Sequence, residues 1–376
     1  MNLRHAAGEL LVVGLAGTDL SGLERAWLKL VRPGGVILFK RNIADVAQTR
    51  TLLHQAGSVC APCAVRCVDV EGGTVNRLRD ALAPLPSAQA VGAAMRRLRR
   101  PALPRQFGSL IARAVKAFGF NTTLAPVVDL ALAEAAEVLG SRPPGAGPAE
   151  VIAFACAFLA GLAAEGVVGC GKHFPGLGGA TGDTHFVTPE IGRNWQQIWN
   201  QDLAPYRELH RAMPMVMTNH AAYPATAGKN RPASASAFWI TRVLRERIGY
   251  RGIVLSDDLE MGGILKFMPV EEAAVAAIRA GSDLIEICHS AELIVRSYEA
   301  LLAQAERSPA FRRLLVERAQ STARKRARLY GKSAARALTA TQFESLRAQI
   351  LRFRDLIAAS EADAIAPRAT SPAEAS

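Results

Sequence analysis

The sequence lacks several features that would place it in a specialised class of protein. No apolar run reaches the ~20 residues that a membrane-spanning helix requires. The early apolar run ELLVVGLAG is too short for a secretory signal, and no basic segment and small-residue cleavage site accompany it. We therefore expect a soluble cytoplasmic protein.

Cysteine is also scarce, and the spacing of the six cysteines gives no disulfide framework. Cys60, Cys63 and Cys67 form a Cys-x-x-Cys motif with one additional thiol, a pattern found in metal and redox sites. No second pair matches them, however, and Cys67 lies within the apolar run AVRCVDV. We expect buried structural thiols here, with a metal site as the alternative.

Acidic residues are outnumbered, with 33 Asp and Glu against 45 Lys and Arg, which gives a formal net charge of +12. The basic residues concentrate at 96–105 and 311–332. The second segment has apolar residues at helical spacing, which favours the solvated outer face of a helix. Neither segment has interleaved aromatics or a nucleic-acid motif, so we expect no nucleic-acid partner. We also expect a monomeric protein.

What the chain does contain is a large supply of apolar residues, 50% of the total, arranged in short runs. Eight such runs, read as strands, alternate with segments of helical periodicity, a pattern typical of a parallel sheet covered by helices. They begin at Leu10, Gly35, Ala64, Thr122, Val167, Pro214, Gly252 and Asp283. The sequence therefore predicts an α/β fold, a closed (β/α)8 TIM-type barrel forming a single large domain over residues 1–335. A helical extension at 336–359 and a disordered tail at 360–376 are expected to follow.

Polar side chains end most of the later predicted strands. They are Asp69, Asp129, Lys172 with His173, Asn219 with His220, and Asp257 with Asp258. In a parallel barrel these carboxyl ends open on one face, where barrel enzymes hold their catalytic residues. Helix capping explains an isolated Asp or Asn, but not a lysine and a histidine that arrive together.

Two short segments supply candidate carboxylates. Asp257 directly follows the buried run GIVL, which suits a carboxylate nucleophile held on a rigid element. Because successive strand residues point to opposite faces, only one of Asp257 and Asp258 is expected to face the pocket. The segment DVEGGTVNRL offers Asp69 and Arg77 around two glycines that allow close approach of a ligand.

The segment KHFPGLGGATGDTH carries the most specific pattern. Lys172 and His173 end a strand, and a glycine-rich run, expected to be mobile, leads to Asp183 and His185. A carboxylate two residues from an imidazole can accept its N–H, which fixes the tautomer and raises its basicity. This pattern favours a movable general acid/base.

Five motifs together resemble glycoside hydrolase family 3, and more closely its single-domain bacterial beta-N-acetylglucosaminidases of cell-wall recycling. In chain order they are GGVILFKRN, VDVEGGTVNR, GKHFPGLGGATGDTH, MVMTNHAAYP and GIVLSDDLEM, and the resemblance covers roughly residues 8 to 330. It implies that Asp257 is the nucleophile and that His185, supported by Asp183, is the general acid/base. It also implies a set of residues that bind the sugar, namely Asp69, Arg77, Arg142, Lys172 and His173.

The resemblance implies retaining, exo-acting hydrolysis of terminal β-linked N-acetylglucosamine, with a small carbohydrate or muropeptide as substrate. No metal or organic cofactor is expected, since side chains handle the charge in this reaction. The chain departs from the family pattern at Leu177, which replaces a histidine, at Val70, which replaces a glutamine, and at Pro143–Pro144, which replace an aromatic residue and a glycine.

Three other functions remain open from the sequence. A glycoside phosphorylase could use the same Asp257 and His185, because a histidine repels phosphate less than a carboxylate does. A catalytically silent barrel that binds carbohydrate or nucleic acid accords with the net charge. A barrel aldolase with Lys172 as a Schiff base is the third alternative.

Overall fold

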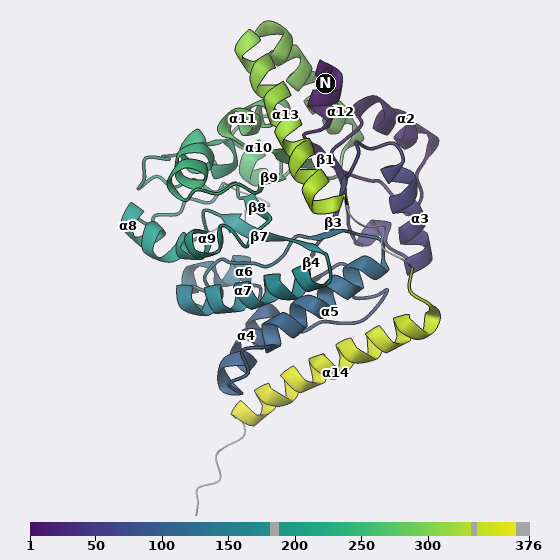
Figure 1. Ribbon diagram of the computed structural model, residues 1–376. Coiled ribbons are helices and arrows are strands. Elements are labelled where there is room, and N and C mark those ends of the chain that lie inside the picture. Colours follow the sequence, from purple (N-terminus) through teal and green to yellow (C-terminus); the bar gives the residue numbers. More distant parts are fainter. Residues whose placement is uncertain (181–187, 332–336, 366–376) are drawn as a thin grey trace, which may run out of the picture.

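A computed structural model describes residues 1–180, 188–331 and 337–365. Eight parallel strands close into a barrel in the order β1-β10-β9-β8-β7-β6-β3-β2 (Figure 1). They are β1 Leu11–Gly14, β2 Gly35–Leu38, β3 Val65–Val68, β6 Thr122–Thr123, β7 Val168–Phe174, β8 Met215–Thr218, β9 Ile253–Asp258 and β10 Leu284–Ile287. Each of the eight predicted strands contains one of them, so the predicted (β/α)8 barrel is confirmed.

Helices cover the outside of the barrel and connect successive strands (Figure 1). The helices before β7 are α1 Leu3–Gly8, α2 Gly22–Val31, α3 Val46–Gly57, α4 Ala88–Arg97, α5 Leu103–Ala117, α6 Ala136–Leu139 and α7 Pro148–Ala164. Those after it are α8 Trp195–Gln197, α9 Ala204–Leu209, α10 Gly262–Leu265, α11 Val270–Ala280, α12 Ala291–Arg307, α13 Pro309–Tyr330 and α14 Ala340–Ile365, with the π-helical turns η3 Ile198–Asp202 and η5 Phe238–Arg247. The continuous apolar strands are needed because both faces of the sheet are buried.

Two apolar cores result from this arrangement. Side chains that point into the barrel form the inner core, which includes Val12, Ile37, Cys67, Met215 and Leu255. Side chains that point outward from the strands pack under the helices in a larger second core. The alternation of strand side chains between these two cores fixes which residues at the strand ends can face the barrel mouth.

The strand β6 is much shorter than the run that predicted it. Pro126 has no N–H and cannot donate to a strand ladder, so the regular strand stops before it. Val127 then pairs with Lys172 of β7 in an isolated bridge, which keeps this part of the chain at the barrel mouth. A small hairpin, β4 Val70–Gly72 with β5 Val75–Asn76, follows β3 at the same end.

The basic segment at 311–332 forms most of α13, and it is not solvated throughout. Arg326 is fully buried, forms an ion pair with Glu9 and donates a hydrogen bond to the carbonyl oxygen of Gly34. At the end of this helix, the hydroxyl groups of Tyr330 and Thr122 lie 2.8 Å apart in a hydrogen bond at the base of the barrel. The expectation of a solvated outer face is therefore wrong for Arg326, which anchors α13 across the amino end of the barrel.

The last helix, α14, lies along α4 and α5 (yellow in Figure 1). Phe353 stacks on Phe107 with ring centroids 5.7 Å apart, and Phe343 packs against Phe118. The helix continues to residue 365, although we expected the helical extension to end at residue 359 and the tail to begin at residue 360. The remainder of the expected tail, residues 366–376, lies outside the described residues.

The cysteines are free thiols, and Cys60 and Cys67 are buried as expected, whereas Cys63 is only partly buried and the expectation is wrong for it. Cys67 lies in the inner core, and burial raises the pKa of the Cys60 thiol to about 12, so this group stays protonated at neutral pH. In the parts of the chain that the structure describes, no cysteine belongs to a group of side chains arranged to hold a metal ion. The described helices include none that is both long and apolar enough to cross a membrane.

Candidate active site

A cavity of about 270 Å³ opens at the carboxyl ends of the barrel strands. Six residues predicted from the sequence line it together: Asp69, Arg77, Arg142, Lys172, His173 and Asp257. They come from segments up to 188 positions apart, counted from Asp69 to Asp257, and only closure of the barrel brings them together. The other two, Asp183 and His185, lie outside the described residues.

Irregular strand pairing places neighbouring residues on the same side at two strands of the cavity. Between β9 and β10, Leu255 pairs with Leu284 but Asp258 pairs with Glu286, so β9 contains one extra residue. Such a bulge breaks the alternation of side chains. Both Asp257 and Asp258 consequently line the cavity, and the expectation that only one would do so is wrong.

A second bulge has the same effect in β7. Gly171 pairs with Val216 and Phe174 with Thr218, which leaves one extra residue in β7. Lys172 and His173 occupy this stretch, and both line the cavity. The peptide bond between them is cis. The successive lysine and histidine in the sequence thus lie where β7 directs both side chains into the cavity.

Lys172 is held between two carboxylates, those of Asp69 and Glu71. Its Nζ lies 2.8 Å from Asp69 Oδ1 and 2.7 Å from Glu71 Oε1, and only 3% of its side chain is exposed. Burial alone would lower the pKa of Lys172, but Asp69 and Glu71 outweigh burial and raise it. Lys172 is therefore charged at neutral pH, which removes the neutral amine that a Schiff base requires.

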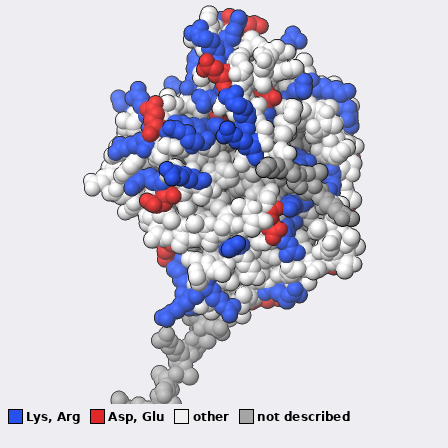
Figure 2. All heavy atoms as spheres, in the orientation of Figure 1, with Lys and Arg blue, Asp and Glu red and all other residues white. Residues whose placement is uncertain are grey.

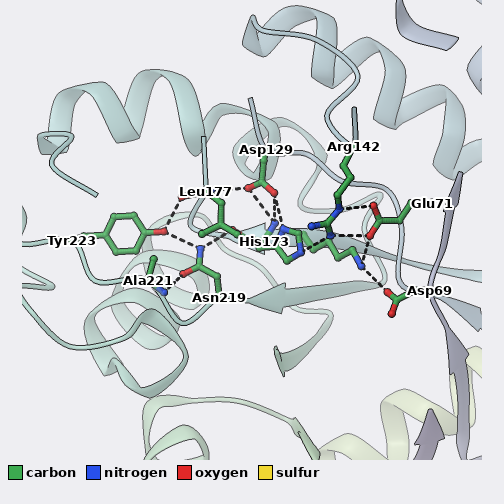
Figure 3. Close-up of polar contacts among 11 residues, drawn as sticks. Asp69, Glu71, Asp129, Arg142, His173, Leu177, Asn219, Ala221 and Tyr223 are labelled. Atoms are coloured by element: carbon green, nitrogen blue, oxygen red, sulfur yellow. Dashed lines mark hydrogen bonds and ion pairs between the residues drawn. The ribbon is translucent and has the colours of Figure 1, made fainter. Parts of the chain in front are cut away.

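Glu71 also holds the predicted Arg142. The guanidinium donates to both oxygens of this carboxylate, over 2.8 Å from Nε and 2.9 Å from a terminal nitrogen (Figure 3). Burial opposes ionisation of Glu71, but Arg142 and Lys172 together hold its pKa far below the ordinary value. The bidentate pair fixes the plane of the guanidinium, and the nearby Pro143–Pro144 departure leaves Arg142 in the cavity.

His173 is oriented by a carboxylate behind it. Its Nδ1 lies 2.7 Å from Asp129 Oδ2, and the backbone N–H groups of His173 and Leu177 donate to the same carboxylate (Figure 3). Its Nε2 lies 3.1 Å from a terminal nitrogen of Arg142; because a guanidinium only donates, Nε2 accepts and Nδ1 carries the proton. Leu177, which replaces the family's usual histidine, thus contributes its backbone N–H to this network.

Asp257 is the predicted nucleophile, and its surroundings keep it ionised. Burial acts to raise its pKa, but His220, His173 and Lys172 together lower it below the ordinary value for an aspartate. The backbone N–H of Asp258 also donates to Asp257 Oδ1 over 3.0 Å. A buried carboxylate that remains charged at the barrel mouth has the form that attack on an electrophilic carbon requires.

Asn219 and His220, also predicted at a strand end, do not line the cavity. Asn219 donates to the carbonyl oxygen of His173 over 3.0 Å, and so positions the backbone of β7. His220 is fully buried, with Nε2 2.9 Å from the carbonyl oxygen of Asp258, and burial lowers its pKa. Each side chain thus hydrogen-bonds to the backbone of a bulged strand, Asn219 to β7 and His220 to β9.

Glu286 on β10 lines the floor of the cavity but was not among the predicted site residues. Only 2% of it is exposed, and burial, followed by the charge of Asp257 and then of Asp69, raises its pKa well above the ordinary value. Its surroundings therefore disfavour the charged form of this carboxyl group. The signal for it is a single glutamate inside the apolar run DLIEIC.

At the rim, Asp258, Glu260 and His289 form the one group in the described part of the chain whose atoms are close enough to hold a metal ion. His289 Nδ1 lies 3.1 Å from a terminal nitrogen of Arg41, which can only donate, so Nδ1 accepts. The ring proton then sits on Nε2, 3.4 Å from Asp258 Oδ2. Both ring nitrogens of His289 are thus engaged, and neither has a lone pair free for a metal. Hydrogen bonds hold these residues together at the rim.

The sequence did not predict the roles of two further carboxylates. Glu71 was not a predicted site residue, and the contact of Asp129 with His173 was not predicted. Glu71 lies between Val70 and Gly72, and it is an acidic residue in a short buried strand. The sequence indicates that Asp129 ends a strand, but its function as the partner of His173 depends on a contact across 44 positions of chain. Neither pairing can be derived from local spacing.

Comparison with known proteins relates this site to a group of hydrolases. Residues 2–320 match the model of the glycosyl hydrolase family 3 N-terminal domain. A beta-hexosaminidase of Idiomarina loihiensis is 33% identical over 296 residues, which span 79% of this chain and 88% of that protein. A beta-hexosaminidase of Chromobacterium violaceum is 37% identical over 285 residues, 75% of this chain and 79% of that protein.

Solved structures agree with these matches. A glycoside hydrolase family 3 beta-N-acetylglucosaminidase from Paenibacillus superposes with a TM-score of 0.84 at 30% identity, over 94% of this chain and 69% of that one. NagZ from Neisseria gonorrhoeae, solved in complex with zinc ion, gives a TM-score of 0.75 at 27% identity, over 92% of this chain and 98% of that one.

Proposed function

Because the chain belongs to glycosyl hydrolase family 3 and is therefore a glycoside hydrolase, we propose that it removes terminal β-linked N-acetylglucosamine by retaining hydrolysis. The relatives named beta-hexosaminidases support a hexosaminide as substrate, and the Paenibacillus structure named a beta-N-acetylglucosaminidase supports this choice of sugar. The observation that carries the proposal is an ionised Asp257 in one small cavity with the charged side chains of Arg142 and Lys172. The size of this cavity suits one terminal sugar, in keeping with exo-action.

In the proposed mechanism, Asp257 attacks the anomeric carbon and forms a covalent glycosyl-enzyme through an oxocarbenium-like transition state. Water then hydrolyses this ester with net retention of configuration. The depressed pKa of Asp257 supports the first step, because the attacking carboxylate must be charged.

We assign the proton transfers to His185, with Asp183 as its orienting partner. His185 protonates the leaving oxygen in the first step and removes a proton from water in the second. Both residues lie outside the described ranges, so this assignment depends on the sequence resemblance alone.

The network around Lys172 supplies the groups proposed to bind the sugar hydroxyls. Lys172 and Arg142 offer N–H donors, Asp69 offers a carboxylate acceptor, and their mutual ion pairs hold them in position before the sugar arrives. Arg77 and His173 complete this set. We propose a muropeptide derived from peptidoglycan as the natural substrate, which places the enzyme in cell-wall recycling.

The test of the sugar is a parallel assay of the 4-nitrophenyl β-glycosides of N-acetylglucosamine, glucose and xylose, with and without inorganic phosphate. We expect the first to be hydrolysed with the highest kcat/KM and free sugar to be the product in both conditions. Preference for the glucoside would refute the assignment of the sugar. Formation of a sugar phosphate would show a phosphorylase instead.

The acid/base assignment has a separate test. His185→Ala is expected to slow the first step for substrates with poor leaving groups, while aryl glycosides that need no protonation are spared in that step. Single-turnover rates across a series of phenols of increasing pKa measure this difference. Equal loss for all leaving groups would contradict the role of His185.

A further inference from the structure

A second pocket, of about 810 Å³, lies at the opposite end of the barrel from the active-site cavity. Its walls are the segments 210–214 and 248–252, which precede β8 and β9, and the last turn of α13. Because residues that precede parallel strands lie at the amino end of a barrel, this pocket is remote from Asp257. Its volume is within the range of small-molecule sites.

The side chains that line this pocket have charge of one sign. Arg211, Arg251, Lys325 and Arg328 are among them, and none of its described lining residues is Asp or Glu. Arg211 and Arg328 are exposed and form no hydrogen bond or ion pair within the described ranges. Lys and Arg side chains also gather along α13 on the face that Figure 2 shows.

The acidic group beneath the pocket does not neutralise this charge. Asp283 is fully buried and already contacts three cations, Arg245, Arg318 and Lys325. The carboxyl end of helix α13 contributes the equivalent of only about half a negative charge. An excess of positive charge therefore remains beside Arg211, Arg251 and Arg328, and an anionic ligand would neutralise it.

The pocket also has an apolar wall. Met213, Pro214, Ile248 and Leu329 line it, and Leu329 is one of the large apolar side chains of the chain that stay exposed, at 37%. His210 Nδ1 lies 2.6 Å from the carbonyl oxygen of Arg207 and donates to it, so Nε2 is the ring atom left to contact a ligand. The lining thus combines a cationic side with an apolar one.

We propose that this pocket binds a small organic phosphate, a ligand with two or more phosphate charges and an apolar or aromatic portion. Guanidinium groups present a planar fork of N–H donors that matches phosphate oxygens, and three of the four cations are arginines. Arg251 uses one donor on the carbonyl oxygen of Arg245, and Lys325 is fixed by Asp283 and by the carbonyl oxygen of Gly252. Two held cations and two free ones form a site for a multiply charged anion.

The experiment is isothermal titration calorimetry of the full-length protein with ADP and with inorganic pyrophosphate. We expect saturable binding at one ligand per chain, with ADP tighter than pyrophosphate because its base covers the apolar wall. Arg211→Gln with Arg328→Gln should weaken ADP binding at least about tenfold, since two charge-assisted hydrogen bonds are lost. Hydrolysis of the 4-nitrophenyl N-acetylglucosaminide should be unchanged in this variant.

The matched control is the double variant Arg313→Gln with Arg352→Gln, which removes the same charge from exposed side chains that do not line the pocket. The control should bind ADP within about twofold of the unchanged chain. Equal weakening in both double variants would show diffuse electrostatics and overturn the proposal. Absence of saturable binding to either phosphate would overturn it as well.

A second arm separates a free phosphate from a lipid headgroup. Vesicles of phosphatidylglycerol in phosphatidylcholine are sedimented with the protein in the presence and absence of ADP. Displacement of the protein from vesicles by ADP, lost in the Arg211 and Arg328 variant, would show that lipid phosphate uses the same pocket. Sedimentation with vesicles but no calorimetric binding of ADP would contradict a site for a soluble ligand.

Discussion

At the carboxyl end of the barrel, Lys172 and Arg142 each contact a buried carboxylate, whereas at the amino end Arg211 and Arg328 contact none in the described part of the chain. Lysine and arginine side chains therefore have different functions at the two ends of the barrel. Charge that is paired and buried fixes the direction of N–H donors, which suits the hydroxyl groups of a neutral sugar. Charge that is unpaired at the surface attracts an anion.

The largest effect on activity is expected at Asp257, the cavity carboxylate whose charge the proposed reaction uses. Asp257→Ala is expected to reduce kcat by on the order of 10³-fold or more, because no nucleophile remains to form the intermediate. The thermal unfolding transition of this variant should stay close to that of the unchanged chain. Initial-rate kinetics and differential scanning calorimetry measure the two effects.

Substitution of Glu71 tests whether the positions of Lys172 and Arg142 depend on the carboxylate that they share. Glu71→Gln leaves Lys172 with Asp69 alone and Arg142 without its buried partner. Removing one partner of a buried ion pair costs about 3–5 kcal/mol of unfolding free energy. Misplaced sugar-binding groups should also lower kcat/KM by about 10²-fold. Urea unfolding and steady-state kinetics of the same preparation measure both losses.

The control for Glu71 is Glu317→Gln, an exposed glutamate of α13 that forms no hydrogen bond or ion pair in the described ranges. It should change neither quantity measurably. If Glu71→Gln unfolds at the same urea concentration as this control, the ion pairs of the cavity do not stabilise the fold.

Asp283 is the corresponding carboxylate at the amino end, and its loss should separate stability from activity. Asp283→Asn leaves Arg245, Arg318 and Lys325 without their shared acidic partner. We expect a loss of about 3 kcal/mol of unfolding free energy. Because the cavity at the other end is untouched, kcat/KM at 25 °C should stay within about twofold.

The effect of Asp283 on stability should also depend on pH. Burial opposes its ionisation, but Arg245 and Lys325 outweigh burial and lower its pKa in the folded state. A group with a depressed folded pKa stabilises fully above its unfolded pKa, about 3.9 for Asp, and loses that contribution as pH falls through the folded value. The difference between the unchanged chain and Asp283→Asn should therefore be constant from pH 6 to 5 and narrow below about pH 4. A difference that grows on acidification would contradict this charge assignment.

Much of this architecture can be predicted from the sequence because the strand signals are local. Each barrel strand came from a continuous apolar run, and the strand ends identified the cavity lining from Asp69 to Asp257. Spacing could not reveal the bulges in β7 and β9, since a bulge is a property of two paired strands. Nor could it reveal that Arg326, within a basic segment, is buried against Glu9. Pairings of this kind are decided by tertiary packing and leave no local pattern.

Substitution of Arg77 should have the smallest effect on stability and activity. This arginine lines the cavity, but its ion pair is longer and more exposed than those of Lys172 and Arg142. Its guanidinium lies 3.9 Å from Asp69 Oδ2 with 36% of its side chain exposed. Partly exposed ion pairs at this distance contribute about 0–1 kcal/mol, so Arg77→Gln should leave the unfolding free energy nearly unchanged. A lost contact to a bound sugar should raise KM by about two- to fivefold with kcat preserved. If instead kcat falls as far as in Glu71→Gln, then exposure does not decide which cavity charges matter, and Arg77 belongs with the buried set.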